Sequence, residues 1–235
     1  MIDFKHRSEE VEIMDTCKGT SSELELILND INRVNNLLGG YRITLNAVFE
    51  LLRFKKKESY TILDMGCSDG TMLKKLASAA RKKNMDLKLI GIDLNAKALE
   101  LAKRNTIDYP EISYIQADIL LHDFSNLKID IVMSTLTLHH FTDDGVLKFV
   151  NRFVQLASIG VVINDLERSP VAYYLFKIFS WFFIKTEIGK KDGLLSIRRA
   201  IKINELRQIA HRVSNVTHHI QWKWAFRYVW VLKKK

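Results

Sequence analysis

Apolar residues along the middle of the chain follow two spacings in turn. Short apolar runs, which are typical of buried strands, alternate with longer segments in which apolar residues lie three and four positions apart, as in helices. The strand-like runs are 61–65, 87–94, 112–119, 130–138 and 160–165, and the helix-like segments are 71–83, 95–105 and 142–157. Strands that alternate with helices form a parallel sheet covered by helices on both faces. We therefore expect a doubly wound α/β fold.

Two further helical patterns precede the sheet, at 22–38 and 43–54, and two adjacent glycines separate them. We interpret residues 1–57 as an N-terminal helical lid. The remaining residues, 58–235, would then form the sheet domain.

The alternation stops at 166–202, which indicates a helical insertion into the sheet domain. Within it, the sequence GKKDG at 189–193 predicts a turn. A helical pattern at 204–212 and two β-rich runs at 217–225 and 226–235 follow. The two runs predict a closing antiparallel hairpin, so that the expected sheet has seven strands and is mostly parallel.

The composition fits a globular protein. The chain has 235 residues, of which 47% are hydrophobic and 27% charged, and Cys17 and Cys67 are its only cysteines. Two cysteines are too few for a disulfide framework. The charged N-terminal residues lack the apolar run of a signal peptide, and the longest apolar stretch, 171–184, is shorter than the roughly 20 residues that span a bilayer. We expect a cytoplasmic protein.

Positive charge is concentrated toward the C-terminus. The net charge is +9, and residues 166–235 contain 15 basic and 4 acidic side chains together with all four tryptophans. A basic, aromatic-rich segment favours contact with an anionic or apolar partner. RNA and the inner face of a membrane, touched peripherally, are two such partners. A solvated basic face beside an aromatic core is the alternative.

Three strand ends carry residues suited to a nucleotide-like cofactor. The first is DMGCSDG at 64–70, where glycines allow a tight turn and free N–H groups of the next helix face outward. The second is Asp93, whose carboxylate can accept both hydrogen bonds of a ribose diol, and the third is Asp118, which suits an exocyclic amine. Ligands of open parallel sheets bind beyond the carboxyl ends of the strands. The three groups are therefore expected to meet at one edge.

In this order and at matching strand ends, the residues resemble the cofactor site of the class I S-adenosylmethionine-dependent methyltransferases. The resemblance covers residues 58–165 well and the two closing strands more loosely. It implies that S-adenosylmethionine is the cofactor. The residues implied to contact it are Asp64, Gly66, Cys67, Ser68 and Gly70 around the methionine part, Asp93 at the ribose, Leu94, Asp118 and Ile119 at the adenine, and Ser134 near the sulfonium.

Ser68 departs from the family pattern. The commoner turn is D-x-G-x-G-x-G, and Ser68 occupies the position of its middle glycine. A serine is acceptable there if its φ is negative, so the departure lowers the expected cofactor affinity more than it argues against the family. The main alternative cofactor is a nicotinamide dinucleotide bound through Asp93, but the G-x-G-x-x-G sequence that it requires does not follow the first strand.

His139 and His140, directly after the fourth strand-like run, are the candidate catalytic residues. The family frequently places residues that face the acceptor at this position, and an imidazole with a pKa of about 6.5 can take a phenolic or enolic proton near neutral pH. The alternative is that one ring bonds a loop carbonyl and the other is exposed. No metal is expected, because adjacent histidines seldom bind one ion without a third ligand, for which only His122 or Asp143 suggests itself.

Candidate acceptor-binding residues come from two neighbouring stretches. The stretch after the fifth strand would lie on the rim of the site, or else cap the next segment. The aromatic stretch 171–184 is interpreted as a lid helix that offers an apolar wall to a flat or alkyl-bearing substrate, with a core helix or a membrane-surface patch as alternatives. The residues concerned are Asn164, Asp165 and Arg168 in the first stretch and Tyr174, Phe179 and Trp181 in the second.

Three segments, INRVNNLLGG, DLERSPVAYYLFKIFSWFF and DGLLSIRRA, are similar to a bacterial subgroup of these methyltransferases associated with aromatic polyketides or quinone-type lipids. The resemblance implies methyl transfer to an oxygen or carbon nucleophile of a small hydrophobic acceptor. RNA methylation is one alternative, which the lack of an N-P-P-Y-type sequence after the fourth strand disfavours. A non-catalytic protein that binds the cofactor and docks to a membrane or partner is the other. The sequence leaves the oligomeric state open.

Overall fold

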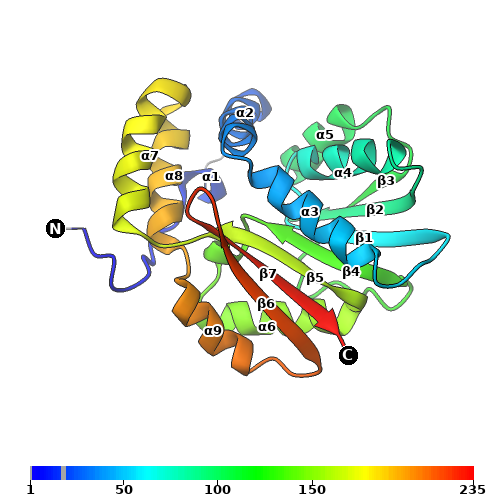
Figure 1. Ribbon diagram of the computed structural model, residues 1–235. Helices are drawn as coiled ribbons and strands as arrows, with labels where there is room; N and C mark the ends of the chain where they lie inside the picture. Colours follow the sequence, from blue (N-terminus) through cyan, green and yellow to red (C-terminus); the bar gives the residue numbers. More distant parts are fainter. Residues whose placement is uncertain (1, 17–19) are drawn as a thin grey trace.

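The computed structural model describes residues 2–16 and 20–235, so that Cys17 lies outside the described residues. Figure 1 shows the elements around one sheet. In chain order they are α1 (Ile13–Thr16), α2 (Ser21–Leu37), α3 (Gly40–Leu52), β1 (Ser59–Met65), α4 (Thr71–Arg81), β2 (Asp86–Asp93), α5 (Ala96–Asn105), β3 (Ile112–Gln116), β4 (Ile129–Thr135), the single 3₁₀ turn η1 (Leu138–His140), α6 (Asp143–Leu156), β5 (Ala157–Leu166), α7 (Pro170–Phe183), α8 (Glu187–Arg199), α9 (Ile203–His211), β6 (Val216–Lys223) and β7 (Arg227–Lys234).

The seven strands form one sheet in the order β3-β2-β1-β4-β5-β7-β6. Strands β1 to β5 are parallel, β7 runs antiparallel to β5, and β6 runs antiparallel to β7. β6 and β7 follow one another in the chain and form the closing hairpin. The expected fold, a mostly parallel seven-stranded sheet with an antiparallel C-terminal hairpin, is confirmed.

Helices cover both faces of this sheet (Figure 1). On one face α3, α4 and α5 pack on the strands through buried residues such as Val48, Leu73 and Leu99. On the other face α6 and α9 pack through buried residues such as Phe149 and Leu206. Because successive side chains of a strand point to opposite faces, each buried strand contributes to both apolar clusters.

The two long N-terminal helices have different positions. In α3 the residues Val48, Leu51 and Leu52 are buried in the cluster that also contains β1 and α4. α2 instead stands beyond the carboxyl ends of the strands (Figure 1). The interpretation of 1–57 as a lid therefore does not fit α3, because the apolar residues of α3 lie on one helical face and that face covers the sheet.

The inserted segment forms a pair of helices, α7 and α8, that also stand beyond the carboxyl ends of the strands (Figure 1). The turn expected at 189–193 is wrong, because these residues lie inside α8. Thr186 caps this helix through a hydrogen bond that Gly189 N donates to its Oγ1 at 3.1 Å. A side chain on Gly193 would overlap the ring of Phe176 in α7. The two glycines therefore serve capping and close helix packing.

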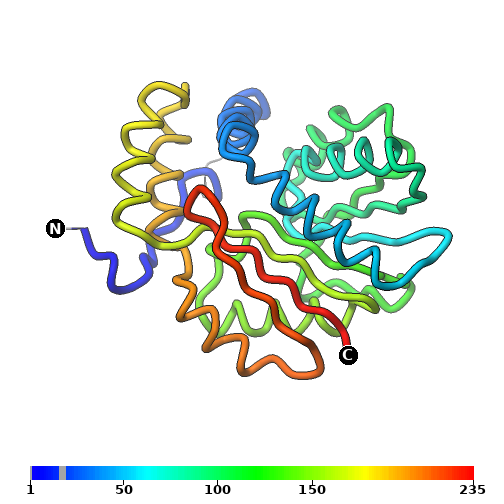
Figure 2. The backbone as a smooth tube through the Cα atoms, in the orientation of Figure 1, coloured from blue at the N-terminus to red at the C-terminus, as the bar shows by residue number. Residues whose placement is uncertain are grey.

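The N-terminal segment runs beside α8 (Figure 2). Ser8 N donates a hydrogen bond to Arg198 O at 3.2 Å, and Arg7 Nε donates one to Arg199 O at 2.7 Å. The first residues of the chain are thereby brought to the same edge of the sheet as the turn that follows β4.

Candidate active site

A cavity of about 930 Å³ opens at the carboxyl ends of β1, β2 and β4. Its walls come from the turns after these strands, from α2, α7 and α8, and from the turn between β6 and β7. It therefore joins segments from both ends of the chain to the centre of the sheet. This edge is where ligands of open parallel sheets bind.

The turn after β1 forms one wall of the cavity. Gly66 has a φ of +78°, and a side chain there would overlap Thr137. Ser68 has a φ of +50°, so the condition of a negative φ is not met. The backbone of Ser68 takes the left-handed conformation that a glycine would take, and Ser68 N is held by donating to Asp93 Oδ2 at 2.9 Å.

Asp93, at the end of β2, has a carboxylate that is fixed by main-chain donors. Its Oδ2 accepts from Ser68 N and its Oδ1 accepts from Asn95 N, each at 2.9 Å. Burial raises the pKa of Asp93, and these two hydrogen bonds oppose the rise. Leu94 and Ile119 lie in the same wall. The result is a fixed carboxylate beside apolar side chains, as a ribose with an attached base requires.

Asp64, at the end of β1, is buried in the cavity wall. Burial raises its pKa to about 8, and the negative charge of Asp93 adds to the effect. Within the described part of the chain, no group donates a hydrogen bond to its carboxylate. A buried acid without a partner is suited to a cationic ligand, because a positive charge nearby favours the ionised form.

Asn32 ties α2 to the turn after β1. Its Nδ2 donates to Asp69 Oδ2 at 2.7 Å and to Thr71 Oγ1 at 3.1 Å, and the Tyr41 hydroxyl donates to its Oδ1. Asn32, Tyr41 and Asp69 all line the cavity. Sequence reasoning missed the first two, because a polar residue on an amphipathic helix gives no sign of the distant loop that it faces.

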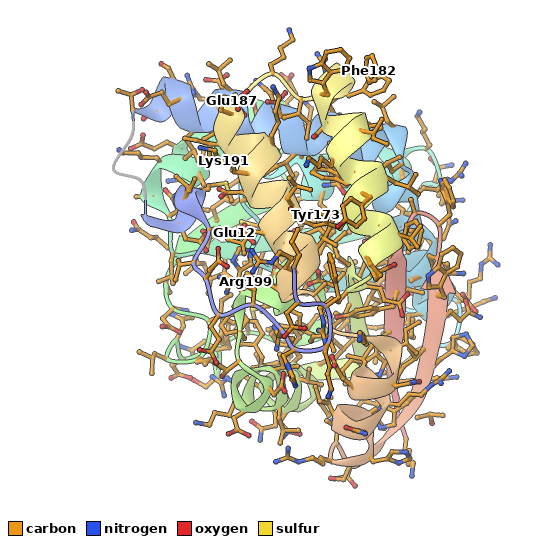
Figure 3. All side chains as sticks on the ribbon, turned by 90° about the vertical axis from the view of Figure 1, so that its left-hand side faces the viewer. Glu12, Tyr173, Phe182, Glu187, Lys191 and Arg199 are labelled. Carbon is orange, nitrogen blue, oxygen red and sulfur yellow. The ribbon has the colours of Figure 1, made fainter. Side chains whose placement is uncertain are left out.

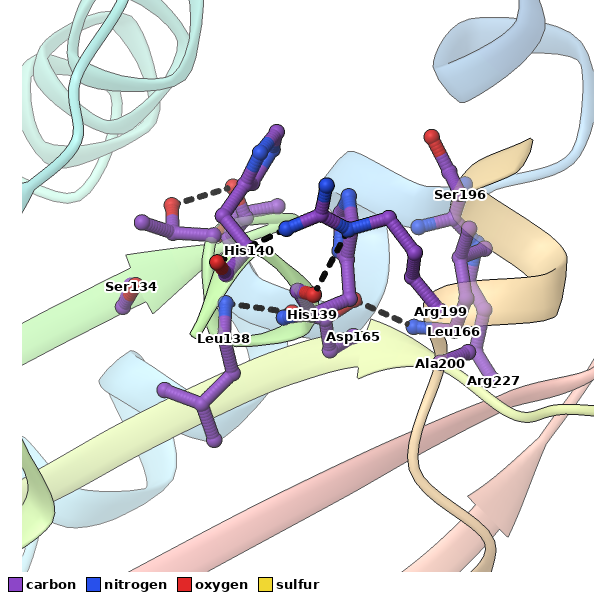
Figure 4. Close-up of polar contacts among 12 residues, drawn as sticks. Ser134, Leu138, His139, His140, Asp165, Leu166, Ser196, Arg199, Ala200 and Arg227 are labelled. Atoms are coloured by element: carbon purple, nitrogen blue, oxygen red, sulfur yellow. Dashed lines mark hydrogen bonds and ion pairs between the residues drawn. The ribbon is translucent and has the colours of Figure 1, made fainter. Parts of the chain in front are cut away.

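His139 lies in η1, after β4, with its ring between two carboxylates. Nδ1 is 2.7 Å from Asp165 Oδ1 (Figure 4), and Nε2 is 3.4 Å from Glu12 Oε1. Burial disfavours the charged ring, but Asp165 and Glu12 together raise the pKa of His139 to about 10. The two carboxylates therefore favour the protonated ring, which argues against a neutral imidazole base at His139.

The Asp165 carboxylate organises the turn that carries both histidines. Besides the His139 ring, it accepts hydrogen bonds from Leu138 N at 2.7 Å, His139 N at 3.3 Å and Leu166 N at 2.7 Å. Burial acts to raise its pKa, but the His139 ring holds the pKa of Asp165 below its ordinary value. The expected position of Asp165 on the acceptor rim is wrong, because these donors occupy its carboxylate inside the structure.

His140 packs on His139, with ring centroids 4.3 Å apart. Its Nδ1 is 2.9 Å from Asp15 Oδ2, and its ring lines the cavity. Glu12 is fixed in turn by Ser196, whose hydroxyl donates to Glu12 Oε1 at 2.8 Å. Sequence reasoning missed Glu12 and Asp15, because acids in a charged N-terminal stretch are typical of exposed chain.

Two arginines fix the main chain of this turn. Arg199 donates to His139 O at 3.2 Å and to His140 O at 2.8 Å, as Figure 4 shows. Arg7 donates to His139 O at 3.1 Å. Glu12 lies beside Arg199 near the end of α8 (Figure 3). The turn is therefore held from the sheet, from α8 and from the N-terminal segment.

Residues 62–160 match the protein family described as a methyltransferase domain. Methyltransferases of this family use S-adenosylmethionine, and the match covers the strands whose ends form the cavity. Residues 62–160 therefore form a methyltransferase domain.

Two curated proteins are similar to the chain. Malonyl-[acyl-carrier protein] O-methyltransferase 1 of Ilyobacter polytropus is 21% identical over 164 residues, which cover 69% of this chain and 56% of the relative. Carboxy-S-adenosyl-L-methionine synthase of Wolinella succinogenes is 33% identical over 97 residues, which cover 41% of this chain and 38% of the relative. The chain therefore spans about half or less of the length of each.

A solved structure of the plantazolicin methyltransferase BpumL, in complex with a triazolic desmethylPZN analog and SAH, is similar over nearly the whole chain. The TM-score is 0.69 at 15% identity, and the match covers 95% of this chain and 94% of that chain. The helical additions around the methyltransferase domain thus have counterparts of similar fold in that protein.

Most of the expected cofactor residues of the methyltransferase domain line the cavity, but Gly70, Asp118 and Ser134 do not. Gly70 begins α4 with a φ of +74°. Asp118 Oδ1 accepts from Leu120 N at 2.8 Å, and Ser134 Oγ donates to Met65 O at 3.1 Å within the sheet. The seven that line the cavity are Asp64, Gly66, Cys67, Ser68, Asp93, Leu94 and Ile119.

The expected acceptor contacts of Asn164 and Arg168 are wrong. Asn164 Nδ2 donates to Gly40 O at 2.9 Å and to Thr44 Oγ1 at 3.0 Å, which joins α3 to β5. The guanidinium of Arg168 is buried, and donates to Glu205 and to main-chain carbonyls of the N-terminal segment and of Ala200. Both side chains use their donors to join elements of the fold.

α7 faces the cavity with part of its surface. Phe176 and Phe179 line the cavity, whereas Tyr174 and Trp181 point outward and Trp181 is 74% exposed. The expectation that 171–184 walls the cavity fits Phe179 and is wrong for Tyr174 and Trp181, because they lie on the opposite side of the helix. The alternative of a core helix is also wrong, since most of α7 is exposed.

Arg227, at the start of β7, is a cavity residue that sequence reasoning missed. It is 2% exposed, and its Nη2 donates to Asn35 Oδ1 at 2.7 Å. Its Nε and Nη1 have no acceptor in the described part of the chain. Burial lowers its pKa to about 10, so the guanidinium stays charged at neutral pH. From the sequence alone, a buried arginine within a β-strand pattern cannot be distinguished from an arginine on the surface.

Replacing the two buried arginines, Arg168 and Arg227, should have unequal effects on stability. Arg168→Gln should lower the free energy of unfolding by about 3 to 5 kcal/mol, because Glu205 and several buried carbonyls would lose their hydrogen-bond donor. Arg227→Gln should change it by less than about 1 kcal/mol, because it removes a charge that has a single partner. Urea denaturation of both variants checks this. Equal losses for the two would contradict the partner sets described.

Proposed function

We propose that this protein transfers the methyl group of S-adenosylmethionine to an oxygen or carbon nucleophile of a small hydrophobic acceptor. The observation that carries the proposal is the continuity of one cavity, from Asp64 and Asp93 of the methyltransferase domain to Phe176 and Phe179 of α7. A cavity of about 930 Å³ lies at the upper end of the roughly 300 to 1,000 Å³ of ligand sites, and its lining extends beyond the strand ends to α7 and α8, which leaves room for an acceptor beside the cofactor.

The acceptor class is inferred from the second half of the cavity. Aromatic and aliphatic side chains of α2, α7 and α8 form most of that wall, which suits an aromatic polyketide or quinone-like molecule. The sequence similarity to the polyketide and quinone-type subgroup points the same way. The names of the similar proteins, which include a malonyl O-methyltransferase and a plantazolicin methyltransferase, support small-molecule or peptide acceptors.

RNA is a weaker candidate for the acceptor. The basic C-terminal region includes Arg168, Arg199 and Arg227, and all three guanidinium groups are buried. Their charges serve the fold and the cavity, so the excess of basic residues in the sequence overstates the positive charge available to a phosphate backbone.

The protein side chains would act by holding the cofactor and the acceptor in the geometry that the reaction requires. Methyl transfer from a sulfonium is an in-line displacement, which requires an aligned acceptor and a site that excludes water. Asp64 would bind the cofactor ammonium and Asp93 the ribose hydroxyls. On the acceptor side, His139 and His140 remain the proposed residues, His140 with Nδ1 on Asp15 and its ring toward the cavity.

Cofactor binding should depend on pH through Asp64. Because the pKa of Asp64 is raised to about 8, the free protein carries this proton at pH 6.5, and binding the ammonium of S-adenosylhomocysteine should release about one proton. Affinity should therefore rise with pH up to about 8 and then level off. Calorimetry at pH 6.5 in buffers of different ionisation enthalpy measures the released proton.

The matched control for this measurement is the exposed Asp86 at the start of β2. Asp64→Asn should abolish proton release and weaken binding at least tenfold, while Asp86→Asn should behave as wild type. Proton release that persists in Asp64→Asn would assign the coupled group elsewhere.

The acceptor wall is tested by Phe179→Ala. This change should raise the acceptor KM at least fivefold and leave the Kd of S-adenosylhomocysteine within twofold, because the cofactor contacts lie on other elements. Phenols with one to three rings serve as acceptors, with S-adenosylhomocysteine release as the signal. Trp181→Ala is the control, since Trp181 points away from the cavity. An unchanged KM in Phe179→Ala would contradict the assignment of this wall.

The outer surface of α7 supports a second proposal, a peripheral membrane contact. Ile178, Trp181 and Phe182 are exposed, Lys177 lies beside them, and Phe182 stands at the far end of α7 (Figure 3). Aromatic residues with lysines are typical of helices that lie in a membrane interface. No helix among the described residues combines the length and hydropathy needed to cross a membrane.

If α7 contacts a membrane, vesicle binding should depend on Trp181 and not on Phe179, the reverse of the result expected for the acceptor KM. Trp181→Ala should lower co-sedimentation with anionic vesicles severalfold, whereas Phe179→Ala should bind vesicles as wild type does. Wild-type protein that stays in the supernatant with vesicles of phosphatidylglycerol would contradict the proposal.

A further inference from the structure

We propose that Glu12, His139 and His140 form a binding site for one divalent transition-metal ion in the wall of the acceptor cavity. The three residues come from the N-terminal segment and from η1, and each offers a ligand atom within 4.8 Å of the other two. All three line the cavity. The ion's role at the acceptor rests on the proposed function, but its binding does not.

The distance between one pair of ligand atoms, on Glu12 and His139, suits a bound ion. His139 Nε2 lies 3.4 Å from Glu12 Oε1, beyond the usual 2.7 to 3.2 Å of an N–H···O bond. Two ligands that are each about 2.0 to 2.1 Å from a tetrahedral ion lie roughly 3.3 to 3.4 Å apart. His139 Nε2 and Glu12 Oε1 are therefore spaced like two corners of a tetrahedral coordination shell.

A carboxylate other than that of Glu12 lies beside Nδ1 of each histidine and fixes its ring. His139 Nδ1 is 2.7 Å from Asp165 Oδ1, and His140 Nδ1 is 2.9 Å from Asp15 Oδ2. With Nδ1–H donated to an acid, an ion that displaces the proton on Nε2 would find the lone pair of each ring there. Metal-binding histidines almost always donate their other ring N–H in this way, to a carboxylate or a carbonyl. Finding it at both members of an adjacent pair is a second observation, independent of the spacing.

The local charges and burial also favour a cation. Glu12 and His139 are 2% and 4% exposed, and Glu12, Asp15 and Asp165 surround the two rings. The nearby cations Arg7 and Arg199 donate to main-chain carbonyls of the turn, and no ion pair joins either of them to Glu12, Asp15 or Asp165 among the described residues. A buried group of acids is stabilised by a bound positive charge.

The donor set indicates the class of ion. Two imidazole nitrogens and one carboxylate form the ligand set of catalytic zinc sites and of non-haem iron(II) sites, in which the remaining positions stay open. Magnesium and calcium prefer oxygen ligands alone. The expectation that no metal binds rested on the lack of a third ligand near the histidines, and Glu12 supplies that ligand from the far end of the chain.

An ion at this site would explain how an acceptor hydroxyl could be activated. His139 is held between Asp165 and Glu12, which favour its protonated ring and make it a weak base for an acceptor hydroxyl. A divalent ion lowers the pKa of a bound oxygen group and orients it, so that the ionised acceptor is available without a protein base.

The test measures Co²⁺ and Zn²⁺ binding by the full chain after treatment with a chelator. Wild-type protein should bind one Co²⁺ per chain with visible d–d absorption, which one equivalent of Zn²⁺ displaces. His140→Asn and Glu12→Gln should each weaken binding at least tenfold. The controls are His219→Asn and Glu9→Gln, which change an exposed histidine of β6 and an exposed acid three residues before Glu12, and both should bind as wild type does.

His140→Asn decides the outcome if Glu12→Gln does not fold, because the His140 side chain is 22% exposed and can be replaced with little loss of packing. Anomalous diffraction at the zinc edge should place a single peak between the three side chains. A wild-type protein with no d–d absorption, or affinities that both variants leave unchanged, would overturn the proposal.

S-adenosylhomocysteine titrations of the same samples separate this proposal from the proposed function. Metal binding without cofactor binding would leave the metal site in place and contradict methyl transfer. Cofactor binding without metal binding would leave methyl transfer in place and contradict the metal site.

Discussion

The buried carboxylate of Asp165 is the constraint on which the acceptor side of the structure depends. It accepts hydrogen bonds from the main chain of Leu138 and His139 and from the His139 ring. Loss of such an acceptor would leave each buried donor without a partner, which would cost about 1 to 3 kcal/mol of stability per donor. Glu12 and Arg199 reach the same turn from the N-terminal segment and from α8. One carboxylate at the end of β5 therefore fixes the place where three distant segments meet.

The charged groups of the cavity wall differ in whether they already have hydrogen-bond partners. Most acids in the wall are already partnered: Asp69 by Asn32 and Thr71, and Asp93 by main-chain N–H groups. Asp64 and Arg227 are charged or ionisable groups whose hydrogen-bonding capacity is largely unused by the described residues. A cofactor ammonium can use the first, and an oxygen-rich group of an acceptor can use the second.

The sequence was informative where partners are close along the chain. Gly66 directly follows β1 and Asp93 is the last residue of β2, so both could be placed from the sequence because strand ends can be recognised from local patterns. Ser68 shows the limit, because its left-handed backbone is held by Asp93, which a local reading of the turn does not include. Asn164 and Arg168 were misassigned for a related reason, since their partners lie in α3, in the N-terminal segment and before α9.

The central claim is that the cavity binds S-adenosylmethionine through the ends of β1 and β2. Calorimetric titration of S-adenosylhomocysteine into wild-type protein and Asp93→Ala tests it most directly. We expect saturable binding with one site per chain in the wild type, and a loss of at least tenfold in affinity in Asp93→Ala, because the ribose hydroxyls would lose their acceptor. Absence of binding to the wild type, together with saturable binding of NADH, would contradict the account.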